Sequence, residues 1–179
     1  MTEPARVRPA TPEDVGDILR LIAELADYEK ESAQAVATPA DLQSALFPDD
    51  GAPTAFAHVA QVQGRVVGMA VWFLSFSTWT GRNGIWLEDL YVEPGHRGAG
   101  IGVELLRTLA QVCLERGYPR LEWHCLDWNE PSIEFYRRIG ADQLSEWLTY
   151  RMGSDAMTTL AESADSTGAP ADPAARKES

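Results

Sequence analysis

The sequence predicts a mixed α/β (α+β) fold, because segments with helical spacing of apolar residues are interspersed with strand-like segments. One strand-like segment runs through a glycine-rich stretch directly into a helix-like one. The length of 179 residues, with 45% apolar and 23% charged residues, is typical of a single globular domain. We expect residues 1–153 to form this domain. Residues 154–179 show no apolar periodicity, and we expect a disordered acidic C-terminal tail there.

The beginning of the chain predicts a short strand followed by two helices. Residues 6–8 form the strand, and Thr11 is the predicted cap of the first helix, with Pro12 and Asp14 completing a capping-box variant. Its apolar stripe consists of Ile18, Leu21, Ile22 and Leu25. The same start signal recurs at residues 38–41 and predicts a shorter second helix.

Strand periodicity begins at residue 56. Residues 56–62 and 66–76 predict two strands joined by a hairpin-like turn at Gln63–Gly64. A polar loop with two glycines follows over residues 77–84, and residues 84–92 predict a further strand.

The second half of the chain predicts two more helices and two more strands. A helix over residues 100–116 ends at Gly117, which is the usual residue after a helix end. Residues 120–126 predict a strand, residues 131–139 a helix, and residues 147–152 a final strand.

The chain is acidic, with 27 acidic and 15 basic residues and a net charge of −12. Nucleic acid is disfavoured as a partner, since phosphate neutralisation needs basic patches. A cationic ligand suits the negative electrostatic field of such a chain, although acidity that serves solubility alone explains the composition equally well. No run of 18 apolar residues and no signal peptide is visible, so we expect no membrane segment and a cytoplasmic location. The two cysteines, Cys113 and Cys125, fit a reducing compartment.

The most informative segment is the glycine-rich turn after the strand at residues 84–92. Gly98, Gly100 and Gly102 leave the backbone bare where a helix begins, and the first N–H groups of a helix have no internal acceptor. The helix dipole favours an anion there, and Arg97 adds a fixed positive charge. This pattern predicts a site for a diphosphate-bearing cofactor. Glycines that serve only a tight strand-to-helix connection are the alternative.

Two common phosphate loops do not match. A P-loop requires Gly-Lys-Ser/Thr, and no lysine follows Gly102. A dinucleotide fingerprint requires a third glycine where this chain has Val103.

Residues 97–102, RGAGIG, instead match the Arg/Gln-x-x-Gly-x-Gly/Ala loop of the GCN5-related N-acetyltransferases (GNAT). Residues 126–141, LDWNEPSIEFYRRIGA, are similar to a later block of that superfamily. The beginning of the chain and residues 76–92 resemble one branch, the diamine (spermidine/spermine) and thialysine N-acetyltransferases. The resemblance covers roughly residues 5–152. It implies an acyl-CoA N-acyltransferase fold, in which a central, mostly antiparallel mixed sheet is flanked by helices and splayed at the cofactor site.

The resemblance also implies acetyl-CoA as co-substrate, no metal, a small primary amine as acceptor, and a homodimer. The implied cofactor-binding residues are Leu90, Tyr91, Val92, Arg97, Gly98, Ala99, Gly100, Ile101, Gly102, Val103, Asn129, Ser132 and Tyr136. Asn129 is equally suited to cap the helix that follows it.

Transfer of acetyl to an amine needs a base, because an alkylammonium titrates near 10.4. Glu88 and Asp89 are adjacent on a strand, so we expect their side chains on opposite faces. The resemblance selects Glu88 as the base and leaves Asp89 structural. It makes Tyr136 the acid that protonates the departing thiolate. A salt-bridged strand acid and a buried, hydrogen-bonded tyrosine are the respective alternatives.

For the acceptor, the resemblance implies contacts from Tyr28, Glu29, Trp79 and Glu88. Diamine acetyltransferases carry an Asp where this chain has Ser77, so the thialysine-type branch fits better. The acceptor is then a diamine, polyamine or thialysine-like amine. A protein lysine or N-terminus, an amino acid or an amine drug stays open as the acceptor, as does a non-catalytic acyl-CoA-binding module.

Overall fold

The computed structural model describes residues 5–163. By its internal contacts the chain divides into two compact units, residues 1–139 and residues 140–179. Each unit is described by itself. Among the described residues, no helix is both long and apolar enough to cross a membrane.

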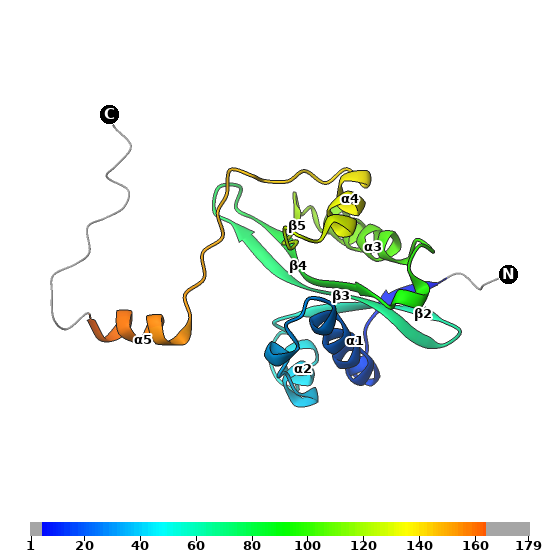
Figure 1. Cartoon of the computed structure of the whole chain (residues 1–179), viewed down its shortest axis with the longest axis horizontal. Coiled ribbons are helices and arrows are strands. Elements are labelled where there is room, and N and C mark those ends of the chain that lie inside the picture. The colour runs from blue at the N-terminus through cyan, green and yellow to red at the C-terminus, as the bar shows by residue number, and fades with distance from the viewer. Residues whose placement is uncertain (1–4, 164–179) are drawn as a thin grey trace. The chain divides into compact units, whose positions relative to one another are not determined.

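The first unit is built on a five-stranded sheet in the order β1-β2-β3-β4-β5 (Figure 1). The strands are β1 (Arg6–Pro9), β2 (Phe56–Val62), β3 (Arg65–Ser77), β4 (Arg82–Val92) and β5 (Leu121–Trp123). Neighbouring strands are antiparallel except β4 and β5, which run parallel. The predicted mixed, mostly antiparallel sheet is therefore confirmed.

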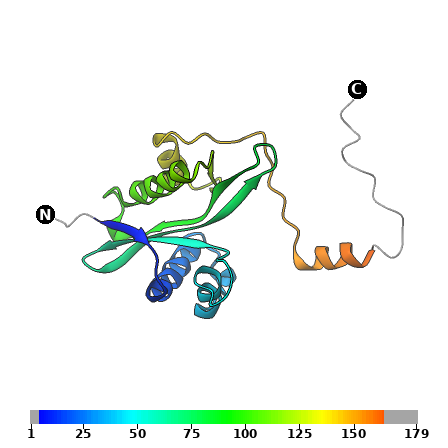
Figure 2. The ribbon, with the colours of Figure 1, turned by 180° about the vertical axis from the view of Figure 1, so that it is seen from behind.

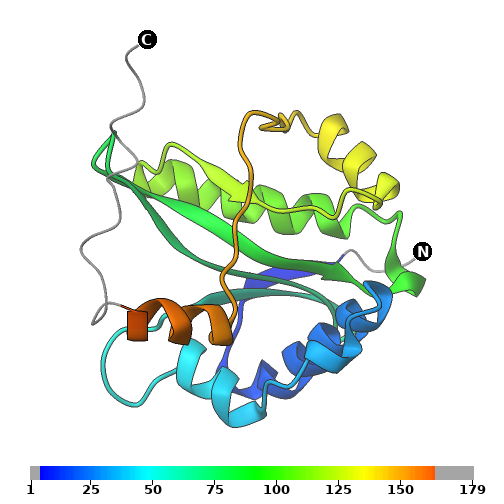
Figure 3. The same ribbon diagram turned by 60° about the vertical axis from the view of Figure 1, so that its left-hand side comes forward.

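Helices cover both faces of this sheet, as the views from opposite sides show (Figures 1 and 2). One face carries α1 (Val15–Tyr28) and α2 (Pro39–Leu46), and the other carries α3 (Ile101–Arg116) and α4 (Glu130–Arg138). The third view separates the two helical layers most clearly (Figure 3). Short 3₁₀ turns lie at Pro12–Asp14, Ser32–Gln34 and Pro94–His96. The predicted helix starts at Thr11 and Thr38 are confirmed as capping boxes.

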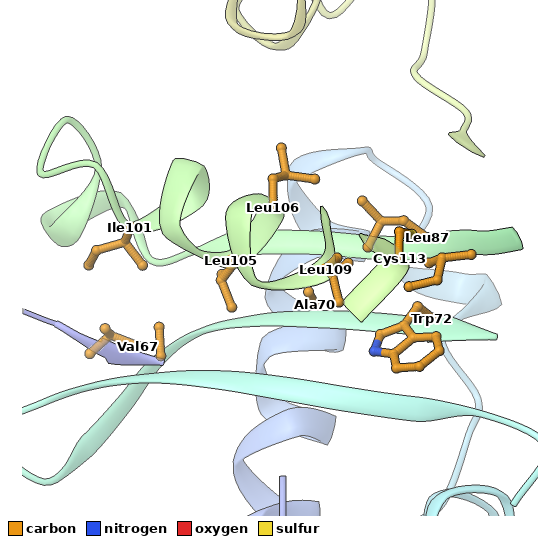
Figure 4. Close-up of a cluster of buried hydrophobic side chains, with 11 residues drawn as sticks. Val67, Ala70, Trp72, Leu87, Ile101, Leu105, Leu106, Leu109 and Cys113 are labelled. Carbon is orange, nitrogen blue, oxygen red and sulfur yellow. The ribbon is translucent and has the colours of Figure 1, made fainter. Parts of the chain in front are cut away.

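Each layer of helices buries its own core. Under α3, the cluster includes Trp72, Leu87, Leu105 and Leu109, which are at most 2% exposed (Figure 4). Under α1 and α2 it includes Ile18, Leu21, Leu46, Val59, Met69 and Tyr91. Leu90 and Val92 pack against the α3 cluster, whereas Tyr91 joins the α1 cluster, as alternation along a strand requires.

A charged network fixes the end of β4. Glu93 is 6% exposed, and its carboxylate accepts hydrogen bonds from Arg20 of α1 at 2.6 Å and from Arg65 of β3 at 2.7 Å. Arg20 also donates to the carbonyl of Val66 at 2.9 Å. A buried carboxylate is stable only when it is paired in this way. The turn that leads to the glycine-rich segment therefore starts from a rigid point.

The parallel pair β4–β5 is short and then splays. Pairing covers only Ile85–Leu87 of β4. At Gly84, β4 lies close to Arg120, the residue before β5. A Cβ atom added to Gly84 would lie 2.7 Å from Cγ and 3.0 Å from the carbonyl oxygen of Arg120. Beyond Leu87 the edge of β4 that faces β5 has no partner strand among residues 5–163.

The second unit differs from the sequence-based expectation. Of its described residues, 140–163, a helix α5 (Ser154–Glu162) forms, so this part of the predicted disordered tail is helical. Met157 and Leu160 have helical spacing, and Ala and Glu are good helix formers. The strand predicted over residues 147–152 is absent from the described residues of this unit. Residues 164–179 of the predicted tail lie outside the described residues.

Candidate active site

The glycine-rich segment has a backbone that only glycine adopts easily. Gly98 and Gly100 have φ angles of +80° and +83°, and no atom lies within 4 Å of the position that a Cβ would take at either residue. Gly100 is the N-cap of α3. Within the described chain, the backbone N–H groups of residues 98–103 donate to no carbonyl or side chain. Six consecutive free amides at a helix N-terminus form a cradle that fits a pyrophosphate.

The splayed edge of β4 lies next to this cradle. Leu90, Tyr91 and Val92 pair with β3 on one side, while their other side faces the space left by β5. An extended ligand arm can add to such an edge as a strand does. The carbonyl of Val92 accepts a hydrogen bond from Nε of Arg97 at 2.8 Å.

Glu88 and Asp89 do not lie on opposite faces, and the prediction that they do is wrong. The register between β3 and β4 shifts here: Val71 pairs with Asp89 and Trp72 with Leu87. Glu88 is thus the extra residue of a β-bulge. Leu87 and Leu90 both pack into the α3 cluster, so the side chains of the two acids between them both point away from the α3 face of the sheet. A bulge breaks the period-two rule on which the prediction depended.

The two acids differ in environment. Glu88 is exposed, and its carboxylate accepts a hydrogen bond from Nε1 of Trp86 at 3.2 Å. Asp89 is partly buried, and burial, with the charges of Glu88 and Glu29, raises its pKa to about 6. A carboxylate with a pKa near neutrality is a common feature of general bases. The sequence analysis left Asp89 structural, because no sequence signal marks the bulge that turns it to the same side as Glu88.

Glu29, at the C-terminal end of α1, reaches the same region. Burial raises its pKa, with a smaller contribution from Glu31. The Glu29 charge also raises the pKa values of Asp89, Cys125 and Tyr136. The helix end of α1, the bulge of β4 and the first turns of α4 therefore converge.

Tyr136 lies on α4 with its ring packed 4.9 Å from Trp123 of β5 and 5.2 Å from Phe135, measured between ring centroids. Burial, followed by the charges of Cys125 and Glu29, raises its pKa to about 12. The hydroxyl therefore stays protonated throughout the physiological range and is available as a hydrogen-bond and proton donor.

A second set of contacts joins α1 to α4. The hydroxyl of Tyr28 donates to Oδ1 of Asn129 at 3.2 Å, and the ring centroids of Tyr28 and Trp128 are 6.2 Å apart. Asn129 is 7% exposed, and the same oxygen accepts from the backbone N–H of Ser132, which confirms the cap role. The Arg97 guanidinium lies over the Tyr28 ring at 5.1 Å and the Tyr91 ring at 5.3 Å.

Trp79 stands apart from this group. It lies in the turn between β3 and β4 and is 91% exposed. Glu88 is six residues into β4 from Arg82, a distance of roughly 20 Å along the strand. Within one chain the structure thus brings together Tyr28, Glu29, Asp89, Asn129 and Tyr136, but not Trp79. No group of three or more His, Cys, Asp or Glu residues within positions 5–163 could hold a metal ion.

A splayed strand pair beside an amide cradle at a helix N-terminus defines an acyltransferase fold of the coenzyme-A-dependent class. The chain belongs to the acetyltransferase (GNAT) family, whose model matches residues 21–141. It is therefore an acetyltransferase, and enzymes of this family use acetyl-CoA as the acetyl donor.

Comparisons with curated proteins and with solved structures agree with this assignment to the family. The chain is 41% identical to the thialysine N-epsilon-acetyltransferase of Bos taurus over 87% of its length and 96% of that protein. It is 39% identical to the thialysine N-epsilon-acetyltransferase of Mus musculus, with the same coverage. The solved structure of an integron cassette protein from the mobile metagenome of V. cholerae superposes with a TM-score of 0.74 at 24% identity, covering 89% of this chain and 99% of that one. This last likeness concerns the fold alone.

Proposed function

We propose that the protein transfers acetyl from acetyl-CoA directly to the primary amine of a small cationic acceptor of the thialysine, diamine or polyamine type. The observation that carries the proposal is the convergence of Glu29, Glu88 and Asp89 beside the splayed edge of β4, next to the amide cradle. The names of the two mammalian relatives support an amine that carries positive charge.

The residues present fit the acyl donor. The N–H groups of residues 98–103 would hold the pyrophosphate, and the open edge at Leu90, Tyr91 and Val92 would hold the pantetheine arm. Asn129 and Ser132 lie at the start of α4 and would contact the arm from the other side of the splay. When bound, acetyl-CoA supplies the acetyl group as an activated thioester. Arg97, stacked on Tyr28 and Tyr91, would close the loop over it.

The pair Glu88 and Asp89 would accept the proton of the acceptor ammonium. Glu88 is exposed on the bulge and would meet the amine first, while Asp89 has a pKa of about 6, which suits a group that accepts a proton near neutrality. The backbone at Val92 would orient the thioester carbonyl. Tyr136, whose pKa of about 12 keeps it protonated, would donate its proton to the sulfur that leaves. No covalent acyl-enzyme is required.

The acceptor would bind through charge. Glu29 and the bulge pair place three carboxyl groups near one amine, and Tyr28 borders them. Ser77, where diamine acetyltransferases carry an Asp, favours an acceptor of the thialysine type. Ser77 pairs with Arg82 beside the turn that carries Trp79, so it would border the acceptor only in the site of a second copy.

We further propose that the enzyme is a cytoplasmic homodimer. In the second unit Trp147, Leu148 and Tyr150 are 67%, 75% and 87% exposed, and exposed apolar groups of this size are a feature of interfaces. Trp79, which does not reach its own chain's site, joins an acceptor site only if a second copy supplies it. Light scattering should give the mass of two chains. Exchange of Trp147 and Tyr150 for Ser should give one chain, and a wild-type monomer would contradict the dimer.

The decisive experiment is a thiol-release screen with acetyl-CoA and a panel of acceptors: thialysine, lysine, short diamines, spermidine and a lysine-containing peptide. We expect thialysine and short diamines to give the highest kcat/KM. A preference for the peptide, or for an amine drug, would move the chain to another acceptor class. Failure to release coenzyme A with every amine would support an acyl-CoA-binding module instead.

A further inference from the structure

A cavity of about 250 Å³ lies at the opposite end of α3 from the glycine-rich segment. Its lining includes Phe47 after α2, Phe56 and His58 of β2, Trp72 of β3, and Val112 and Arg116 of α3. Gly100 and Arg116 are separated by the whole of α3, roughly 24 Å at 1.5 Å per residue. The cavity therefore does not belong to the proposed acetyl-transfer site.

One wall of the cavity is aromatic. The rings of Phe56 and Trp72, which are partners across β2 and β3, stack with centroids 4.5 Å apart and planes inclined by 22°. Trp72 is 2% exposed, so this wall is held in place by the core. Flat aromatic walls of this kind favour a planar or compact apolar group.

A second wall carries a histidine with one free nitrogen. His58 is 7% exposed, and its Nδ1 accepts a hydrogen bond from Nε1 of Trp72 at 3.2 Å. Burial, and to a smaller extent the charge of Arg116, lowers the pKa of His58, so the ring is neutral at pH 7. Because Nδ1 accepts, the proton of the neutral ring sits on Nε2. This N–H makes no hydrogen bond with any group in residues 5–163.

Arg116 completes the polar part of the cavity. It is exposed in the last turn of α3, and it forms no ion pair with the described residues. The residues that line the cavity include no carboxylate, although the chain as a whole carries a net charge of −12. The guanidinium and the Nε2–H of His58 are therefore two donors that no acid of the cavity satisfies.

We propose that this cavity is a second ligand site that binds a small carboxylate with a planar apolar body. The carboxylate would accept from Arg116 and from Nε2–H of His58, and the body would lie against Phe56 and Trp72. Drug-sized ligands usually occupy about 300–1,000 Å³, so this cavity suits a molecule of the size of benzoate.

The test is an NMR titration of the full chain, labelled with ¹⁵N, with benzoate. The indole N–H signal of Trp72, assigned with Trp72→Phe, is the reporter because that N–H contacts His58. We expect saturable binding in the millimolar range, with benzamide, the neutral isostere, binding at least about tenfold more weakly.

Arg116→Gln should weaken benzoate binding about tenfold and leave the other indole signals in place. Arg107→Gln is the matched control: Arg107 lies on the same helix, pairs with Glu104 and does not line the cavity, so affinity should not change. Equal affinity of Arg116→Gln and wild type would overturn the proposal. So would an unmoved Trp72 signal, or displacement of benzoate by saturating acetyl-CoA, which would place benzoate in the acyl-donor site.

Discussion

The hydroxyl of Tyr28 donates a hydrogen bond to Oδ1 of Asn129 at 3.2 Å, although their helices cover opposite faces of the sheet. The contact passes the edge of the sheet where β4 and β5 have separated. Because Arg97 lies over the ring of Tyr28, this tyrosine links the glycine-rich turn, the end of α1 and the cap of α4. It spans the place where both substrates are proposed to bind.

Tyr28→Phe removes that hydrogen bond and keeps the ring. The loss of one hydrogen bond amounts to about 0.5–1.5 kcal/mol, so we expect KM for the amine to rise a few-fold while the melting temperature changes little. Steady-state kinetics at saturating acetyl-CoA measure this effect. Tyr118→Phe, at a half-buried tyrosine of the α3 core, is the control and should leave KM unchanged. An unaltered KM in Tyr28→Phe would remove Tyr28 from the acceptor site.

Gly100→Ala tests the amide cradle. Alanine at a φ of +83° costs about 1–2 kcal/mol, and the turn relieves this strain by moving its N–H groups. Affinity for coenzyme A should fall about 5- to 30-fold in calorimetry, with the fold retained. Gly95→Ala is matched to it, since Gly95 has no positive φ and its Cβ position is equally open. If both variants bind coenzyme A like the wild type, the cradle does not hold the pyrophosphate.

Tyr136→Phe tests the proton donor. General acids contribute about 10²–10⁴-fold, so kcat should drop by that factor, while coenzyme A affinity stays within a few-fold of wild type because the ring still packs on Trp123. Single-turnover kinetics and calorimetry separate the two effects. A kcat close to that of wild type would assign Tyr136 a purely structural role.

The roles of Glu88 and Asp89, the two acids at the bulge, can be distinguished by the pH dependence of kcat/KM. A base that titrates at about 6 must lose its proton before it acts, so kcat/KM should rise with pH up to about 6 and level off above it. Asp89→Asn should abolish this inflection and lower the plateau. Glu88→Gln should keep an inflection but move it to lower pH, because the charge of Glu88 helps to raise the pKa of Asp89, and it should lower the plateau. A wild-type profile that is flat through pH 6 would exclude Asp89 from the proton transfer.

Asp89 should also make stability depend on pH. Its pKa is about 6 in the folded protein, against an ordinary value of 3.8, so the folded state binds the proton more tightly than the unfolded state. Its stabilising contribution is present below about pH 4 and is lost as pH rises through about 6. Asp89→Asn should therefore raise stability above pH 6 by up to about 3 kcal/mol and change little at pH 4. Thermal melts at both pH values measure this, with Glu115→Gln, at an exposed acid of α3, as control. A variant that melts lower than wild type above pH 6 would show that the carboxylate is well solvated.

Much of the first unit follows from sequence patterns, because its elements are long and carry local signals. The hairpin turn at Gln63–Gly64, the caps at Thr11 and Thr38, and the helix that ends at Gly117 are all set by neighbouring residues. The glycine-rich cradle was predictable for the same reason.

Features that depend on long-range contacts escaped prediction. The bulge at Glu88 results from how β3 and β4 pair, and the sequence of neither strand indicates it. The raised pKa of Asp89 depends first on its burial in the folded chain, then on Glu88, and also on Glu29, sixty residues earlier in the chain. The contact of Tyr28 with Asn129 joins residues 101 positions apart. The strand predicted in the second unit is absent from its described residues; a strand, unlike a helix, cannot satisfy its backbone alone, so its own residues do not suffice to predict it.

Gly84 has a consequence for how the enzyme could be altered. An added Cβ at this position would lie 2.7 Å from Cγ and 3.0 Å from the carbonyl oxygen of Arg120, the residue before β5. The side chain of Arg120 would have to move, and β5 would shift slightly at the end where it pairs with β4. Since β5 leads into the segment that ends at Asn129 and Tyr136, such a shift would carry the proposed acid and the α4 cap together. The spacing of the proposed acceptor site would thus respond to a residue that never meets a substrate.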